Sequence, residues 1–386
     1  MIRVLIVENA LPVALLLKSM LDAQAGLRVV GHASDGAEAL RLVHALRPDV
    51  IALAPRLPDD PGGVETTRRI MEELPTPIVL VGSAQDRADA QTPFRALELG
   101  AVAVYGSPPQ LGDPRADARA RELAELLQAM AGAKLVRRRR ARPADAPARD
   151  PAAPRLLAVA ASTGGPLALA AVLGGLPVEL PVPVLVVQHI SKGFLPGMVE
   201  WLGSRCRLPC GIAADGAELE AGRVYFAPDE HHLLVAASGT RLYARLSDGE
   251  PVDRHRPAAT PLFAAIAREC GARAIGLVLT GMGGDGATGL LELRRAGALT
   301  LAQSPASCVI DGMPEAAIRL GAVAEVVALA EIAPRLRRAL GLAPARAAAE
   351  ADPDQFGVTT VAALDAADGQ LGDAAGLTFA AQGEKR

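Results

Sequence analysis

Short apolar runs alternate with longer amphipathic stretches over the first 135 residues. In the stretch 36–46, apolar side chains recur with the helical period and share one face. Strands that alternate with helices predict a parallel sheet covered by helices on both faces. The apolar runs expected to form its five strands are residues 2–7, 28–32, 50–54, 78–81 and 101–105.

A second alternating pattern begins at Arg155 and extends to about Leu342. Continuous apolar runs at 156–160, 184–188 and 275–280 are typical of central parallel strands. The shorter runs 223–227, 233–236 and 241–245 are separated by turn residues, which predicts an antiparallel β insertion. We expect a doubly wound, mostly parallel α/β sheet, with helices that include 261–270, 285–296 and 332–340.

The composition between and after these regions predicts the domain boundaries. Residues 136–154 contain four consecutive arginines followed by Ala, Pro, Arg and Asp, and they predict a linker because they hold almost no large apolar side chain. The arginine run could bind an acidic partner, although a solvated linker edge is the simpler interpretation. The predicted units are thus 1–135, the linker 136–154, 155–342, and a disordered tail 343–386.

Composition and charge narrow the class of protein. Half of the 386 residues are hydrophobic, which allows a sizeable core, and the net charge of −3 gives no reason to expect nucleic acid as partner. The four cysteines fit neither a zinc motif nor a disulfide framework, so we expect reduced thiols. The N-terminus lacks a signal peptide, and no apolar stretch is long enough for membrane insertion. These features predict a cytoplasmic protein.

Three polar residues of the second region follow predicted strands. Ser162 enters a Gly-Gly-Pro turn, His189 follows the run 184–188, and Asp285 ends a glycine-rich loop after the run 275–280. Ligands bind outside the carboxyl ends of strands in open α/β sheets, so these side chains are expected at one edge. A histidine base activates a serine nucleophile, and a carboxylate orients the base. The three residues are therefore candidates for a catalytic triad.

Structural interpretations compete with this one. Ser162 and Asp285 could each simply cap a helix, and His189 could be a buried structural histidine. The loop Gly281-x-Gly283-x-x-Gly286 also fits a dinucleotide-binding fingerprint. That fingerprint expects an acidic residue at the end of the next strand, where Gln303 and Ser304 stand instead. Dinucleotide binding therefore stays the weaker alternative.

The ordered motifs of the second region resemble those of the chemotaxis protein-glutamate methylesterases. The matching blocks are Ala161-Ser-Thr-Gly-Gly-Pro166, Val187-Gln-His-Ile190 with Gly193-Phe194, Phe226-Ala-Pro228 with His232, Leu262-Phe263, Leu279-Thr-Gly-Met-Gly-Gly-Asp-Gly-Ala287, and Gln303 to Pro314. The resemblance implies that Ser162 is the nucleophile, His189 the base and Asp285 its orienter. It also implies that Thr163 and Met282 line the active site, together with Gly164 and Gly281.

The same resemblance implies the reaction and its partners. Family members hydrolyse glutamate methyl esters on the cytoplasmic domains of chemoreceptors, and many also deamidate receptor glutamines. The esterase step uses no metal or organic cofactor. A chemosensory histidine kinase or array protein is a further expected partner. A catalytically silent chemosensory scaffold is the alternative from a different class, and the presence of all three triad residues argues against it.

The first region resembles a flavodoxin-like response-regulator receiver but departs from its phosphorylation motif. Glu8-Asn9 stands where receivers carry an acidic pair, Ala54 where the acceptor aspartate belongs, and Ser107 where a lysine belongs. An alanine offers no oxygen to a phosphoryl group, so the receiver is expected to be degenerate and not phosphorylated at this position.

Other residues near the expected phosphorylation site do not restore the motif. Ser83 keeps a hydroxyl after the fourth predicted strand, and Asp59 and Asp60 are remote substitutes for the acceptor. We therefore expect the receiver to act as a phosphorylation-independent interaction module or as a fixed cover over the active site.

Overall fold

The fold was analysed in a computed structural model of the chain. It describes residues 1–58, 62–82, 92–106, 116–132 and 154–343. The expected linker 136–154 lies outside these residues except for Pro154, and so does the expected tail, apart from Ala343.

The N-terminal unit is a parallel five-stranded sheet of order β2-β1-β3-β4-β5. Its strands are β1 (Ile2–Val7), β2 (Leu27–Ala33), β3 (Val50–Leu53), β4 (Ile78–Val81) and β5 (Ala103–Tyr105). Its helices are α1 (Leu11–Asp22), α2 (Gly36–Leu46), α3 (Gly62–Glu73), α4 (Thr92–Glu98) and α5 (Ala116–Ala131). The predicted fold of this region is confirmed.

The C-terminal unit contains a seven-stranded parallel sheet of order β14-β13-β12-β6-β7-β9-β8. Its strands are β6 (Leu156–Ala161), β7 (Val184–Gln188), β8 (Cys210–Ile212), β9 (Val224–Phe226), β12 (Ala274–Val278), β13 (Leu299–Gln303) and β14 (Glu325–Val327). A separate antiparallel hairpin is formed by β10 (His232–Ser238) and β11 (Arg241–Ser247). The predicted doubly wound sheet with an antiparallel insertion is thus confirmed.

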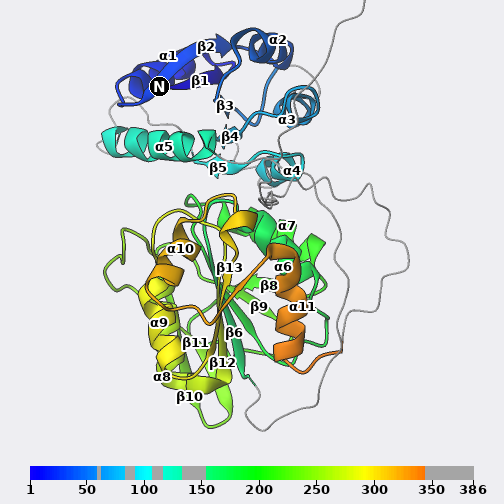
Figure 1. Ribbon diagram of the computed structural model, residues 1–386, viewed down its shortest axis with the longest axis vertical. Coiled ribbons are helices and arrows are strands. Elements are labelled where there is room, and N and C mark those ends of the chain that lie inside the picture. The colour runs from blue at the N-terminus through cyan, green and yellow to red at the C-terminus, as the bar shows by residue number, and fades with distance from the viewer. Residues whose placement is uncertain (59–61, 83–91, 107–115, 133–153, 344–386) are drawn as a thin grey trace, which may run out of the picture.

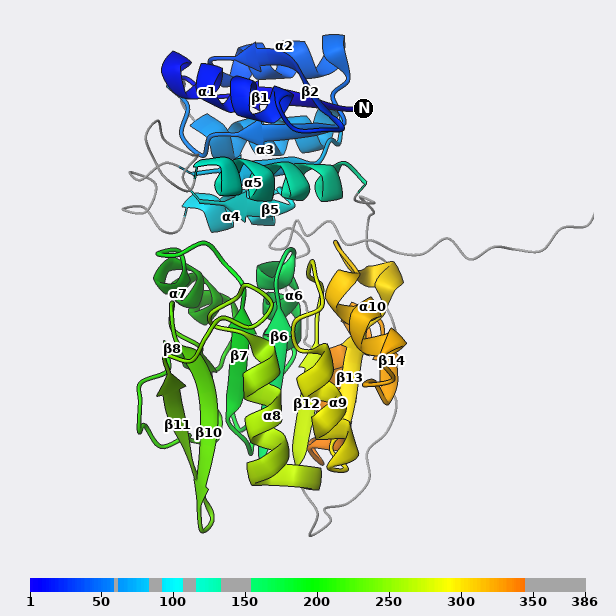
Figure 2. The same ribbon diagram turned by 90° about the vertical axis from the view of Figure 1, so that its left-hand side faces the viewer.

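Helices cover both faces of the large sheet (Figures 1 and 2). One face packs on α6 (Gly165–Gly174), α7 (Leu195–Arg205) and α11 (Leu329–Ala339). The other packs on α8 (Ala259–Cys270), α9 (Ala287–Arg295), α10 (Gly312–Arg319) and the β10–β11 hairpin. Burial on both faces explains why the central strands read as unbroken apolar runs.

One part of the predicted insertion was wrong. The run 223–227 was expected to be antiparallel, but β9 pairs in parallel with both β7 and β8 inside the main sheet. All three residues of β9 are buried, which is typical of a strand with helices or a hairpin on both sides. Length and turn residues do not reveal strand direction, so the sequence pattern could not separate β9 from the hairpin.

The two units contact each other through α4 and β5 on one side and α7 on the other. Phe94 of α4 stacks on Trp201 of α7, with ring centroids 5.7 Å apart. Glu98 accepts a hydrogen bond from the Trp201 indole and pairs with Arg205 at 2.5 Å. The Gly106 N–H donates to Ser191 Oγ at 2.9 Å, two residues beyond His189. The N-terminal unit therefore sits beside the strand ends of the C-terminal one.

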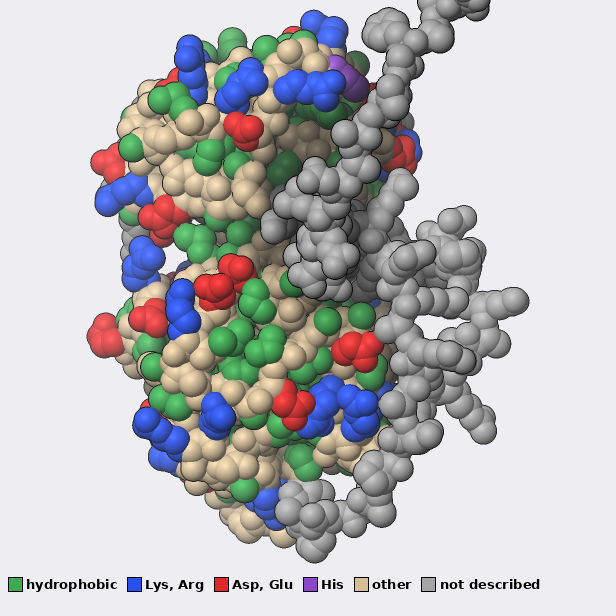
Figure 3. All heavy atoms as spheres, viewed as in Figure 1, with side chains coloured by type: hydrophobic (Ala, Val, Ile, Leu, Met, Phe, Trp, Pro, Cys, Tyr) green, Lys and Arg blue, Asp and Glu red, His purple; other side chains and the backbone are tan. Residues whose placement is uncertain are grey.

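The surface charges in Figure 3 are mixed, and the described helices are not of the membrane-spanning kind. On the face shown in Figure 3, basic and acidic side chains are interspersed over both units. Among the described residues, no helix combines the length and apolar character that crossing a bilayer requires.

Candidate active site

The three candidate residues lie at the carboxyl ends of adjacent strands. Ser162 follows β6, His189 follows β7, and the loop that carries Asp285 follows β12. β6 lies between β12 and β7, and chain order reverses direction at β6, which is where doubly wound sheets bind ligands. The sheet topology thus brings residues from distant parts of the sequence to one site.

A tight turn exposes the Ser162 side chain at the sheet edge. The Ser162 N–H donates to the Thr280 carbonyl at 3.0 Å, which ties the β6 end to the β12 end. Gly164 then adopts a φ of 77°, and α6 begins at Gly165. A built Cβ on Gly164 would lie 2.7 Å from Val309 Cβ, so only glycine fits this turn. The N-terminal end of α6 follows the serine directly; its Gly165 N–H donates to the Ser162 carbonyl at 2.8 Å, and Pro166 has no N–H.

His189 and Asp285 form a buried hydrogen-bonded pair. His189 Nε2 lies 2.9 Å from Asp285 Oδ2, and the side chains are 7% and 1% exposed. Burial would raise the pKa of Asp285, but hydrogen bonds from His189, Ala259 and Thr260 outweigh it and lower the pKa to about 2. Because the ionised carboxylate only accepts hydrogen bonds, Nε2 carries the proton and Nδ1 is left as the basic nitrogen.

Asp285 also caps a helix, but not the one expected from sequence. Its carboxylate accepts from Ala259 N at 2.6 Å and Thr260 N at 3.0 Å, in the first turn of α8. The expected helix, α9, begins only at Ala287, and its cap residue Gly286 has no side chain. In return, Thr260 Oγ1 accepts from the Gly286 N–H at 2.8 Å. These hydrogen bonds therefore link the N-terminal ends of α8 and α9, and they restrict rotation of the Asp285 side chain.

A second histidine, which the sequence analysis did not single out, packs on the first. The His255 ring stacks on His189 with centroids 3.9 Å apart and planes 9° from parallel. Burial and the neighbouring His189 lower the pKa of His255 to about 4. His255 is therefore neutral at pH 7, and its ring restricts the plane of His189. The one cue in the sequence was its rarity as one of six histidines.

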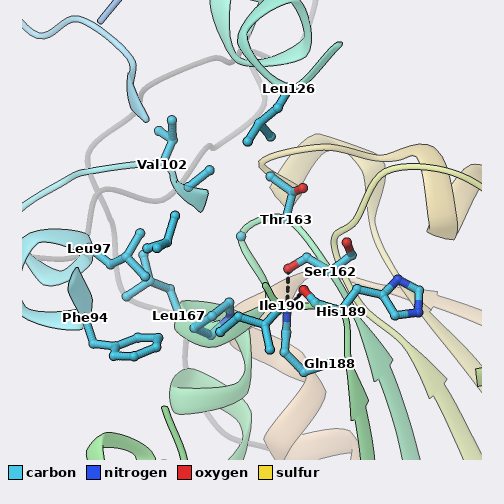
Figure 4. Close-up of a pocket in the computed structure, with 14 residues that line it drawn as sticks. Phe94, Leu97, Val102, Leu126, Ser162, Thr163, Leu167, Gln188, His189 and Ile190 are labelled. Atoms are coloured by element: carbon cyan, nitrogen blue, oxygen red, sulfur yellow. Dashed lines mark hydrogen bonds between the residues drawn. The ribbon is translucent and has the colours of Figure 1, made fainter. Parts of the chain in front are cut away.

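Ser162 and His189 form no hydrogen bond with each other in this conformation. His189 Nδ1 is buried and has no hydrogen-bond partner among the described residues. Figure 4 shows Ser162 and His189 side by side at the edge of the sheet. Proton transfer requires Ser162 Oγ and Nδ1 to come within about 3 Å, and such bonds are often longer before substrate binds.

A small cavity of about 60 Å³ lies at the junction of the two units, beside Ser162 and His189. The C-terminal unit contributes Ser162, Thr163, Gly164, Pro166, Leu167, Gln188, His189 and Ile190, and the N-terminal unit contributes Phe94, Leu97, Val102, Ala103, Val104 and Leu126. Such a volume holds only a few water molecules. The N-terminal unit thus restricts access to the site.

The expected lining residues divide into two groups. Thr163 and Gly164 line the cavity, while Met282 and Gly281 are absent from its lining. Gly281 is packed behind the serine, because a built Cβ would lie 2.3 Å from Met313 Sδ and 2.7 Å from Ser162 Cβ. Met282 is half-buried in the loop between β12 and α9.

Gln188 connects Ser162 and His189, a contact that the sequence analysis did not predict. Its Nε2 donates to the carbonyls of Ser162 at 2.7 Å and His189 at 2.9 Å, so it joins the two turns that carry these residues. The built Cβ of Gly165 would lie only 2.0 Å from Gln188 Oε1, which explains the second glycine of the turn. Among the described residues, no cluster of three or more metal-binding side chains occurs.

The described part of the expected phosphorylation site holds no acceptor at position 54. Ala54 is 8% exposed, directly after β3. Asn9 is exposed, and the Glu8 side chain accepts from the Ala10 N–H at 2.8 Å. The other residues considered there, Asp59, Asp60, Ser83 and Ser107, lie outside the described residues.

Comparison with known proteins supports the family resemblance of both halves of the chain. Residues 157–336 match the CheB methylesterase family model, and residues 4–104 match the response regulator receiver domain. A protein-glutamate methylesterase/protein-glutamine glutaminase of Anaeromyxobacter dehalogenans is 48% identical, over 87% of this chain and 98% of its own length. One from Geobacter metallireducens is 42% identical, over 83% and 94%. The crystal structure of the Thermotoga maritima CheB methylesterase catalytic domain aligns with a TM-score of 0.47 at 31% identity, over 48% of this chain and 97% of that chain. By its relatives, this chain belongs to the protein-glutamate methylesterase/protein-glutamine glutaminase family.

Proposed function

We propose that this chain hydrolyses glutamate methyl esters on chemoreceptor proteins, and deamidates receptor glutamines, with Ser162 as nucleophile. The observation that carries the proposal is the buried 2.9 Å hydrogen bond between His189 and Asp285 beside the Ser162 turn. A bonded carboxylate fixes the imidazole tautomer, so that the free nitrogen is available as a base. The relatives' names supply protein glutamate methyl esters and protein glutamines as substrates, and the resemblance to chemotaxis methylesterases supplies the chemoreceptor.

The arrangement supports a two-step acyl transfer. His189 Nδ1 takes the Ser162 proton as Oγ attacks the ester carbonyl carbon, and the same proton then leaves with methanol. Water, deprotonated by His189, next attacks the acyl-serine and releases the glutamate carboxylate. The amide of glutamine follows the same path and releases ammonia. Asp285 stabilises the imidazolium that forms in each step, and the positive end of the α6 dipole, next to Ser162, favours the oxyanion.

The receiver-like unit is proposed to act as a cover that does not depend on aspartyl phosphorylation. Support comes from Ala54, which has no acceptor oxygen, and from the contacts that Glu98 makes with Trp201 and Arg205. Opening requires these contacts to be broken by receptor or partner binding. A chemosensory histidine kinase or array protein as that partner stays a prediction.

Methanol release from a methylated receptor fragment tests the proposed activity. The wild-type chain should release methanol, and Ser162→Ala should reduce the rate about 10⁴- to 10⁶-fold. Equal rates for the two proteins would favour the alternative of a catalytically silent scaffold. Acetyl phosphate should neither label an aspartate in residues 1–135 nor raise the rate; labelling with activation would disprove the phosphorylation-independent cover.

A further inference from the structure

Two free cysteines meet at the end of α7. Cys206 follows the last residue of the helix, and its N–H donates to the Leu202 carbonyl at 3.0 Å. Cys210 begins β8. Their Sγ atoms are 3.5 Å apart, and both thiols lie 3.4 Å from the Leu208 carbonyl oxygen. Two sulfurs in hydrogen-bonding contact need only a small approach to form a bond of about 2.0 Å.

The other two cysteines of the chain provide a contrast. Cys270 and Cys308 are also free and buried, and burial raises the pKa of both thiols. The hydrogen bond between the two thiols instead lowers the pKa of Cys206, while it raises the pKa of Cys210. Because the thiolate is the form that reacts with oxidants, the pair at α7 is the more reactive site.

The pair adjoins the contact between the two units. Arg205, the residue before Cys206, pairs with Glu98 of α4. Trp201, one helical turn earlier, stacks on Phe94 and donates to the same Glu98 carboxylate. Figure 1 shows α7 directly opposite α4. A covalent change at Cys206 therefore acts at the C-terminal end of α7, which contacts α4 of the receiver-like unit.

We propose that Cys206 and Cys210 are a dithiol modification site, which peroxides oxidise to a disulfide that loosens the contact of α7 with the receiver-like unit. The Cys206 thiolate attacks a peroxide oxygen and cleaves the O–O bond, which gives a sulfenic acid and water. The Cys210 thiol then attacks that sulfur, the S–S bond forms and a second water leaves. Two thiols and one hydrogen peroxide thus give one disulfide and two waters.

The direction of the effect follows from the positions of the two sulfurs. Closing the bond draws Cys206 toward β8, which lies in the C-terminal sheet, and shifts the adjacent Arg205 relative to Glu98. Loss of this ion pair uncovers the Trp201 indole, which is 4% exposed in the closed state. Regulation of hydrolysis by this step rests on the proposed function, whereas disulfide formation and indole exposure do not.

The test uses the full chain treated with hydrogen peroxide. Mass spectrometry should show the loss of two hydrogens and a bridged Cys206–Cys210 peptide, both reversed by dithiothreitol. Trp201 is the single tryptophan of the chain, so its fluorescence reports on the contact directly and should shift to the red. Methanol release should rise in parallel where the proposed function holds.

Matched variants separate the pair from the other thiols. Cys270→Ala/Cys308→Ala should respond like the wild type, whereas Cys206→Ser and, independently, Cys210→Ser should form no bridged peptide and show no reversible red shift. Absence of the bridged peptide in the wild type would overturn the modification site. A bridged peptide without a change in Trp201 emission would overturn the link to the cover. Neither readout depends on esterase activity.

Discussion

The His255 ring lies parallel to the ring of His189, with centroids 3.9 Å apart. His189 is held in its plane by Asp285 at one edge and by His255 on one face. A neutral ring on that face fits a base that becomes positively charged during each step, because aromatic faces attract cations. We therefore expect His255 to position the base.

Substitution of His255 tests this role. His255→Ala should lower kcat about 10- to 100-fold by freeing the His189 ring, whereas His255→Phe, which keeps a stacked ring, should retain most of the activity. Initial rates of methanol release at saturating substrate would measure both. Equal losses in the two variants would show that stacking is not what His255 contributes.

His255 also predicts a dependence of folding stability on pH. Its pKa is about 4 in the folded chain against 6.5 for a free histidine, mainly because of burial. As pH falls from 6.5 to 4, the unfolded chain binds the proton first, so stability is lost in this window, by up to about 3 kcal/mol. Urea unfolding at pH 7 and pH 4.5 should show a smaller loss for His255→Phe than for the wild type. The same loss in both would contradict the assignment.

Two substitutions of Asp285 should separate its role in catalysis from its role as a helix cap. Asp285→Asn keeps a single oxygen that can accept from one α8 amide and cannot stabilise the imidazolium, so kcat should fall about 10⁴-fold with only part of the capping stability lost. Asp285→Ala loses the cap as well and should cost a further 1–2 kcal/mol or so in urea unfolding. A wild-type rate for Asp285→Asn would remove the aspartate from the mechanism.

Gly281→Ala should disturb the nucleophile directly. The new methyl group would meet Met313 Sδ at 2.3 Å and Ser162 Cβ at 2.7 Å, so Ser162 must shift. A displacement of this kind can cost on the order of 100-fold in rate. Gly211→Ala is the control, because nothing lies within 4 Å of its built Cβ. Unchanged kcat in Gly281→Ala would show that the serine tolerates the shift.

The cover should be weakened by one substitution on α4. Glu98→Ala removes the acceptor for Trp201 and the partner of Arg205, and a loss of 1–2 kcal/mol or so from the closed state would raise the rate about 5- to 30-fold. Glu72→Ala, which removes an exposed ion pair with Arg68, is the control and should leave the rate unchanged. An unchanged rate in Glu98→Ala would argue against a cover held by this contact.

Much of this architecture was predictable from sequence because buried parallel strands are continuously apolar. The bounds of β1, β4, β7 and α2 coincide with the predicted runs. The three-residue strands β8 and β14 were missed, since so few residues at the sheet edge carry no period. The parallel direction of β9 depends on neighbours far away in the chain and was predicted wrongly.

The candidate site shows the same division. Ser162, His189 and Asp285 could be selected because each follows a strand or a glycine turn. His255 could not, because it lies in a charged loop between Arg254 and Arg256, and the fold alone brings it to His189. Asp285 as cap of α8 is likewise a contact between segments 25 and 26 residues apart. Contacts between the two units likewise leave no local pattern in the sequence, so they could not be predicted from it.

The central claim is that Ser162 and His189 act as one catalytic unit. The direct test is the rate of methanol release by Ser162→Ala, His189→Ala and the double variant, each checked for wild-type stability. Members of one unit are not additive, so each single substitution should reduce the rate about 10⁴- to 10⁶-fold and the double variant no further. Losses that multiply in the double variant, or a Ser162→Ala protein with the wild-type rate, would contradict it.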